Sequence, residues 1–90
     1  MESYSIHFHI KLSADKDLRH LPRDVVLRAM GKIEDLKSEP FPSQSIRISG
    51  SIRLHRLRVG DYRIIYEVDP EAKKITIHYI RHRSFAYRNL

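Results

Sequence analysis

Arginine supplies most of the chemistry that this sequence offers. Residues 1–45 contain seven Lys/Arg and seven Asp/Glu, whereas residues 46–90 contain ten and four, so the second half carries the whole formal charge of +6. Eight of those ten basic residues are arginines: Arg47, Arg53, Arg56, Arg58, Arg63, Arg81, Arg83 and Arg88. Arginine binds phosphate through planar, bidentate hydrogen bonds and is less strongly hydrated than lysine. The pattern therefore predicts a basic surface for a phosphate-rich partner, with nucleic acid as the first candidate.

Four of these arginines, Arg53 among them, fall on two strand-like segments that are joined by Gly60 and Asp61, a tight-turn signal. Side chains alternate between the two faces of a strand, so Arg56 and Arg58 share one face of the first segment. In the second segment Arg63 points away from the apolar face. If the apolar faces of both segments line the core, Arg56, Arg58 and Arg63 come together on the exposed face.

A third strand-like segment brings further cationic groups to the edge of the sheet. It runs out through Arg81, His82 and Arg83 and is followed by Tyr87 and Arg88. Several like charges on one open face imply an anion that neutralises them. Strand parity places His82 opposite Arg81 and Arg83, so its imidazole reaches the basic face only if the strand ends or twists there.

Hydrophobic periodicity predicts the elements that position these side chains. Apolar residues alternate with polar ones over residues 4–11, which is the period of a half-buried strand. Ser13 is a suitable N-cap for a short first helix, because Pro22 disfavours helical geometry at Leu21 and can itself begin a second helix. The second helix has an apolar stripe of Val26, Met30, Ile33 and Leu36, widened by Leu27 and Ala29.

Pro40 and Pro42 end the second helix and make residues 38–44 a loop. Strand signals begin at Ile46, and strands are predicted over 51–59, 62–68 and 75–83. The order β-α-α-β-β-β predicts a single α+β domain over residues 1–90. We expect a helical hairpin packed on one face of a twisted antiparallel sheet, with the other face free to bind a partner.

Composition excludes several other classes of protein. The chain has no Cys, so it has neither disulfides nor a thiolate zinc site, and this fits a reducing cytosol. The first residues lack the basic and long apolar regions of a signal peptide. No stretch approaches the roughly 20 apolar residues that cross a bilayer. We therefore expect a small, basic, cytoplasmic domain.

The histidines and one glutamate offer weaker alternatives. His7 and His9 share a strand face, as do His78 and His82, but no Cys or cluster of acidic residues accompanies either pair. No metal and no cofactor are therefore expected. Glu67 lies on the same strand face as Arg63 and is predicted to be its ion-pair partner, with a general-base role as the alternative.

Two segments resemble the RelE family of toxins from toxin–antitoxin pairs. They are Leu54–Tyr66, which reads LHRLRVGDYRIIY, and Ile80–Arg88, which reads IRHRSFAYR. The order β-α-α-β-β-β and the helix break at Leu21-Pro22 are also typical of the family. The resemblance implies a cytoplasmic endoribonuclease, an mRNA interferase that cleaves message in the ribosomal A site. The 2′-OH of one nucleotide attacks the adjacent phosphate and leaves a 2′,3′-cyclic phosphate and a 5′-OH.

The resemblance also implies roles for individual residues. The cations that bind the phosphate and stabilise the transition state correspond to Arg56, Arg63 and Arg83. Tyr87 corresponds to the residue that stacks on, or exchanges a proton near, the reacting nucleotide. The predicted RNA- and ribosome-binding residues are Arg53, Arg58, Arg81, His82 and Arg88. For Arg53 and Arg58 a solvated strand edge is the alternative. Where well-studied members have a further basic residue, this chain has Leu54.

A cognate acidic antitoxin, similar to RelB, is the partner that the resemblance implies, in a hetero-oligomer. We expect an extended antitoxin segment with an amphipathic helix that folds as it binds the toxin. The apolar stripe of the second helix then lines either the core or the antitoxin-facing surface. Two other functions stay open: a ParE-like toxin that inhibits DNA gyrase without nuclease activity, and a catalytically silent RNA- or ribosome-binding domain.

Overall fold

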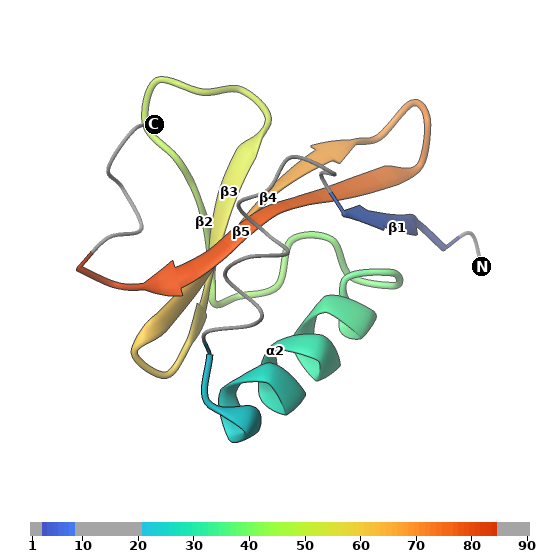
Figure 1. Cartoon of the computed structure of the whole chain (residues 1–90). Helices are drawn as coiled ribbons and strands as arrows, with labels where there is room; N and C mark the ends of the chain where they lie inside the picture. Colours follow the sequence, from blue (N-terminus) through green and yellow to red (C-terminus); the bar gives the residue numbers. More distant parts are fainter. Residues whose placement is uncertain (1–2, 9–20, 85–90) are drawn as a thin grey trace.

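A computed structural model describes residues 3–8 and 21–84 of the chain. It shows an α+β fold in which one helix packs on one face of a five-stranded sheet (Figure 1). The elements are β1 (Ser5–Phe8), α2 (Arg23–Asp35), β2 (Ser45–Arg47), β3 (Leu54–Val59), β4 (Tyr62–Asp69) and β5 (Lys74–His82). The predicted fold class is confirmed. The short helix predicted to begin at Ser13 lies outside the described residues.

The strand order in the sheet is β1-β5-β4-β3-β2. Strands β2 to β5 pair antiparallel, as predicted, but β1 pairs parallel with β5, so the sheet is mixed. The parallel pair follows from the path of the chain, which leaves β1, passes through α2 to the far edge and returns by three reversals. The last strand therefore runs in the same direction as the first.

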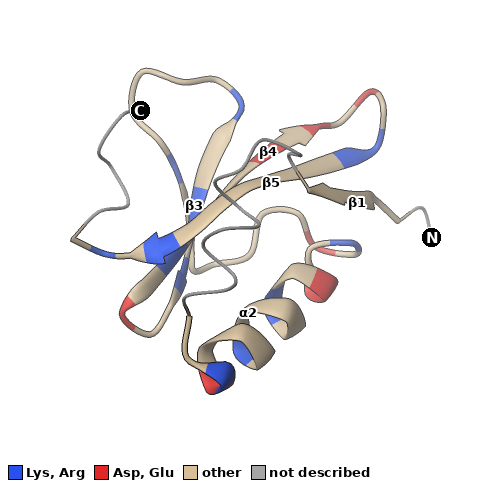
Figure 2. Ribbon diagram, viewed as in Figure 1, with Lys and Arg blue, Asp and Glu red and all other residues tan. Residues whose placement is uncertain are grey.

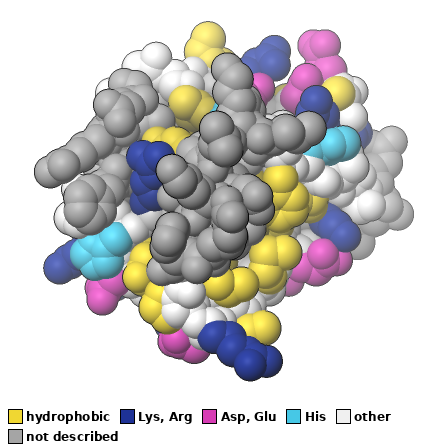
Figure 3. All heavy atoms as spheres, viewed as in Figure 1, with side chains coloured by type: hydrophobic (Ala, Val, Ile, Leu, Met, Phe, Trp, Pro, Cys, Tyr) yellow, Lys and Arg dark blue, Asp and Glu magenta, His cyan; other side chains and the backbone are white. Residues whose placement is uncertain are grey.

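Helix α2 begins directly after Pro22, close to the predicted start, and buries a stripe of Val25, Ala29 and Ile33, continued by Leu36. Of the predicted apolar stripe, Ile33 and Leu36 face the core, whereas Met30 is 40% exposed and Leu27 is 65% exposed. At about 100° per residue, the positions of Val25, Ala29 and Ile33 point at the sheet, whereas those of Leu27 and Met30 point away from it. Figure 3 shows hydrophobic side chains gathered on the α2 side of the molecule.

The core lies between α2 and one face of the sheet. Strand parity was predicted correctly for β3 and β4, since His55, Leu57 and Val59 are buried, as are Ile64, Tyr66 and Val68. The sheet contributes these side chains to the hydrophobic cluster: Leu57, Val59, Ile64, Tyr66, Val68, Ile75, Ile77 and Ile80. Ile65 departs from the simple pattern, because it is 0% exposed although it points to the opposite face.

An irregularity in the pairing of β4 with β5 changes the side-chain phase of β5. Ile65 pairs with Tyr79 and Tyr66 with Ile77, which leaves His78 as the extra residue of a β-bulge. Before the bulge Ile77 faces the core, and after it Ile80 does. Beyond the bulge, Ile80 and the residues that follow it therefore alternate between the two faces in the opposite order from the residues before it.

Strand signals were expected from Ile46, but a separate strand β2 at the sheet edge was not predicted, and the segment predicted as a strand from residue 51 forms β3 only from Leu54. Between the two strands Gly50 has φ +83°, and the Leu54 N–H donates to Ser51 Oγ at 3.1 Å. The chain therefore turns there instead of extending. The predicted turn at Gly60 is confirmed, since Val59 pairs with Tyr62 and Gly60 has φ +59°.

No helix among residues 3–8 and 21–84 is both long enough and apolar enough to span a bilayer.

We predict that Ile64→Ala lowers the free energy of unfolding by about 2–5 kcal/mol, because it removes a fully buried side chain from the middle of the core. Urea denaturation followed by circular dichroism measures the change. The matched control is Ile52→Ala, since Ile52 is 85% exposed and its truncation should alter stability by less than about 0.5 kcal/mol. Equal losses in both variants would contradict the assignment of the core.

Candidate functional site

Three arginines form a row across the sheet on the face opposite α2. Arg58 on β3 pairs directly with Arg63 on β4, and Arg63 pairs directly with Arg81 on β5. Paired positions on neighbouring antiparallel strands have Cα atoms about 4.5–5.5 Å apart. Figure 2 shows basic positions on β3 and β5 near this end of the sheet. We call Arg58, Arg63 and Arg81 the arginine row.

A hollow of about 330 Å³ lies beside the arginine row. Its lining residues are Ser43, Gln44, Ile46, Arg56, Arg58 and Arg63. The structure thus brings Arg56, Arg58 and Arg63 together, as strand parity predicted. Arg56 belongs to the neighbouring row, in which it pairs with Ile46 on one side and with Ile65 on the other. We call this feature the arginine hollow.

Arg63 is held by the backbone of the β3–β4 turn. Its Nη1 donates to the carbonyl oxygens of Gly60 and Tyr62, each at 3.0 Å. These contacts use two of the five N–H donors of a guanidinium and leave the three on Nη2 and Nε. The turn therefore fixes the side chain while the edge that can bind an anion in a bidentate manner stays available.

The electrostatics of the hollow favour an anion. Like charges placed directly opposite on paired strands destabilise a sheet, by roughly 0.2–1 kcal/mol per pair. Among the described residues, the lining of the hollow includes three arginines and no acidic side chain. A phosphate between these arginines would relieve their repulsion and accept charge-assisted hydrogen bonds.

Arg81 and Arg83 occupy different positions relative to the row. Arg81 pairs with Arg63, and its guanidinium carbon lies 4.4 Å from the centre of the Tyr79 ring. Arg83 has the same strand parity but lies beyond the row, where its N–H donates to the Asp61 carbonyl at 2.8 Å and its side chain is exposed. The geometry therefore places Arg81, predicted only to bind RNA, closer to the centre of the site than Arg83.

Some of the predicted residues lie away from the hollow. His82 packs edge-on against Tyr62 at 5.5 Å between ring centres, and its Nδ1 accepts the Ser84 N–H at 3.3 Å. It thus faces away from the arginine row, because side chains alternate regularly from Ile80 to His82 in the part of β5 that follows the bulge. Arg53 lies at the other end of β3, 3.7 Å from a carboxylate oxygen of Asp69. Tyr87 and Arg88 fall outside the described residues.

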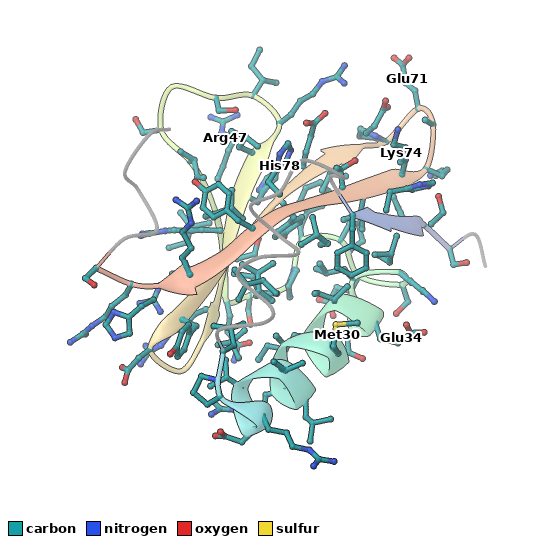
Figure 4. The ribbon with its side chains drawn as sticks, in the orientation of Figure 1. Met30, Glu34, Arg47, Glu71, Lys74 and His78 are labelled. Atoms are coloured by element: carbon teal, nitrogen blue, oxygen red, sulfur yellow. The ribbon has the colours of Figure 1, made fainter. Side chains whose placement is uncertain are left out.

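The predicted ion pair between Arg63 and Glu67 was wrong. Glu67 lies 3.2 Å from Nε2 of His78 and 3.9 Å from a guanidinium nitrogen of Arg53. Four residues along one strand separate Arg63 from Glu67 by about 13 Å, so the shared face does not bring them into contact. This acidic group lies toward the β4–β5 turn, where Figure 4 shows Glu71 and Lys74.

Sequence reasoning missed the wall of the hollow that Ser43, Gln44 and Ile46 provide. Residues 38–44 were predicted as a loop, which is correct, but a loop prediction gives no position. Ile46 reaches the hollow because β2 pairs with β3 and sets Ile46 beside Arg56. The one local sequence signal is Ile46 itself, an apolar residue between Ser45 and Arg47. Its side chain is 54% exposed in the structure.

An aromatic stack holds the loop behind this wall. The ring of His55 lies between those of Phe41 and Tyr66, at 5.0 and 5.5 Å between centres, and Tyr66 donates to the Pro40 carbonyl at 2.8 Å. Burial lowers the pKa of His55 from 6.5, with a further contribution from the charge of Arg47. Burial raises the pKa of Tyr66 from 10.0, against a hydrogen bond with Ser45 that lowers it.

Sequence and structure comparisons place the chain among known toxins. The family model of the ParE toxin of type II toxin–antitoxin systems matches residues 8–87. A Methanocaldococcus jannaschii protein named for the toxin RelE (RelE1) is 35% identical over 77 residues, which is 82% of this chain and 86% of that protein. The toxin RelE of Mycobacterium tuberculosis is 27% identical over 92 residues, which is 97% of this chain and 91% of that protein.

A solved structure agrees with these sequence relatives. The archaeal RelE–RelB complex from Pyrococcus horikoshii OT3 contains a chain that matches with a TM-score of 0.77 and 32% identity, over 92% of this chain and 98% of that one. The fold and the comparisons together define a toxin of a type II toxin–antitoxin system. The chain belongs to the RelE/ParE family of these toxins, and the predicted resemblance to RelE is confirmed.

We predict that acid destabilises the protein through His55. Its pKa is lower in the folded chain, so the unfolded chain binds the proton first as the pH falls below about 6.5. The contribution to stability is complete above pH 6.5 and is lost as the pH falls through the lower, folded pKa. In His55→Phe, the difference between the urea midpoints at pH 7.5 and pH 5 should be smaller than in the wild type. The exposed His7→Phe is the control and should keep the wild-type decrease.

Proposed function

We propose that this toxin is a ribosome-dependent endoribonuclease that cleaves mRNA in the A site by attack of a 2′-OH on the adjacent phosphate. The observation that carries the proposal is the arginine hollow. Arg56, Arg58 and Arg63 line it, and Arg81 extends the row beside it. Such a face suits a substrate whose reacting group is a phosphodiester, and cytoplasmic message on the ribosome supplies one.

The reaction needs charge stabilisation more than any other contribution from the protein. The 2′-oxygen loses its proton and bonds to phosphorus, the bond from phosphorus to the 5′-oxygen breaks, and the leaving oxygen gains a proton. Negative charge builds up on the phosphorane between these steps. In this proposal Arg63, with three donors left, and Arg81 beside it bind the non-bridging oxygens. Arg56 adds charge from the next row, and Arg83 adds charge at the end of the row.

Proton transfer requires another kind of group. Arginine is almost always protonated in proteins, so the arginines of the hollow are poor bases. Tyr87 corresponds to the family residue that stacks on the nucleotide or exchanges a proton near it, and we assign it that role. His82 faces away from the row and Glu67 lies rows away from it, so neither is part of the proposed proton pathway.

An antitoxin is the second partner that we propose. Related structures were solved as complexes of RelE with RelB, from Pyrococcus horikoshii and from Methanococcus jannaschii. An acidic antitoxin similar to RelB would neutralise the arginine hollow of this chain. The exposed Leu27 and Met30 on α2 offer apolar surface for the same partner.

A ParE-like inhibitor of DNA gyrase is the second candidate function. The family model that matches is described as a ParE toxin. Leu54 also favours this candidate, because it places an apolar side chain where RelE members have a basic one. A toxin of this kind would need no group for proton transfer.

We predict that primer extension on a defined message in translating ribosomes detects new 5′ ends when the protein is added. Arg63→Ala should reduce cleavage on the order of 10²–10³-fold, as expected for the loss of one preorganised donor group. Arg81→Ala should cost more than Arg83→Ala, because Arg81 pairs with Arg63 and Arg83 lies beyond the row. The control is Arg23→Ala, on the exposed start of α2, which should cleave like the wild type.

Intact message alongside toxicity in cells would overturn the nuclease proposal. Inhibition of gyrase supercoiling by the same preparation would then support the ParE-like function. Ribosome binding that weakens with salt but yields no new ends would support the catalytically silent RNA-binding domain.

A further inference from the structure

The side chain of Gln44 is exposed at the rim of the arginine hollow and accepts a hydrogen bond from helix α2. Lys32 on α2 donates from Nζ to Oε1 of Gln44 at 2.8 Å. A lysine ammonium has only donors, so the amide oxygen, and not the amide nitrogen, must face it. The NH₂ group of Gln44 is thereby turned away from Lys32. Within the described part of the chain, Gln44 makes no other side-chain hydrogen bond.

Gln44 separates two neighbouring hollows. It lines the arginine hollow, and it also lines a second hollow of about 250 Å³ that contains Lys32, Asp35 and Glu39. Because Lys32 occupies its amide oxygen, the NH₂ group is the part of the Gln44 amide that stays available where this residue lines the arginine hollow. The wall of that hollow therefore presents a neutral donor group among charged ones.

The loop that carries Gln44 is itself held in place. The Ser45 N–H donates to the Pro42 carbonyl at 2.9 Å, and the Tyr66 hydroxyl donates to the Pro40 carbonyl at 2.8 Å. Directly after Gln44 the chain enters β2 and pairs with β3. A side chain at the rim of the hollow thus keeps its position without the cost of ordering a mobile loop.

Ile46 adds an apolar contact beside the amide. It lines the arginine hollow, is 54% exposed and pairs with Arg56. In single-stranded RNA the bases are read by contacts with their faces and by hydrogen bonds with their edges, and Ile46 and Gln44 can supply one of each. The charged part of the hollow can hold the phosphate while this wall meets the base.

We propose that Gln44 and Ile46 form a nucleobase subsite of the arginine hollow and that it selects keto bases over amino bases. The distinction applies to the position that carries O6 in guanine and O4 in uracil, which accept from the Gln44 donors, whereas the N6 amino group of adenine and the N4 amino group of cytosine are donors that oppose them. A free glutamine can offer both its oxygen and its nitrogen to adenine. Lys32 is the positioning residue, since it occupies the oxygen. This inference rests on the proposed function, because it assumes that the hollow binds RNA.

The test compares base preference at the mapped cleavage sites of messages that vary each codon position. The wild type should favour guanine and uracil at one position on the order of tenfold, the discrimination expected of a directed hydrogen bond. Gln44→Ala should abolish the preference. Lys32→Met should relax it toward adenine with little change in the maximal rate, and Lys32→Arg should restore it. The matched control is Lys37→Met, because Lys37 bonds Glu34 and not Gln44.

A second measurement separates failure of the subsite from failure of the nuclease proposal. Oligo(U) and oligo(A) trinucleotides are titrated into the full chain, and the side-chain NH₂ resonances of Gln44 are followed by NMR. A shift with oligo(U) that exceeds the shift with oligo(A) supports the subsite even if no message is cleaved. Cleavage whose base preference is unchanged in Gln44→Ala and Lys32→Met would overturn the subsite and leave the nuclease intact.

Discussion

The single extra residue in β5 is the constraint on which both the core and the basic face depend. A regular strand would keep Arg81 on the same side as Ile75 and Ile77, inside the core. The bulge at His78 resets the phase, so Ile80 is buried and Arg81 joins Arg63 on the open face. One irregular position thus lets the same strand bury apolar side chains on one face and present charged side chains on the other. Bulges near functional sites commonly redirect a side chain in this way.

Local contacts offset part of the repulsion on the basic face. Like charges opposed across strands cost roughly 0.2–1 kcal/mol per pair, and a cation over an aromatic ring returns about 0.5–1 kcal/mol at an exposed site. Arg81 receives such a contact from Tyr79, and the backbone carbonyls of the turn hold Arg63. These contacts let the arginines remain in a row, and the contacts of Arg63 with the turn use only one of its terminal nitrogens.

Much of the site could be predicted from the sequence, because alternation along a strand is a local property. The parity of β3 and β4 was sufficient to bring Arg56, Arg58 and Arg63 together. Features that depend on register could not be predicted. The pairing of Arg81 with Arg63 needs the bulge, and the arrival of Ile46 at the hollow needs the pairing of a three-residue strand. The predicted ion pair of Glu67 with Arg63 failed for the opposite reason. Two residues can share a strand face and still lie too far apart along the strand to make contact.

The order of the strands in space differs from their order in the chain, and this has a consequence for folding. Strand β5 is the last described strand, yet it lies inside the sheet between β1 and β4. Ser5 bonds to the carbonyl of Lys73, 68 positions later, and among the described strands β1 pairs with β5, so β1 joins the sheet only when β5 is in place. Contacts this distant in sequence form late, because the chain must first close a long loop. The step that docks β5 completes the core and sets Arg81 beside Arg63, so a partly folded toxin would lack the complete arginine row.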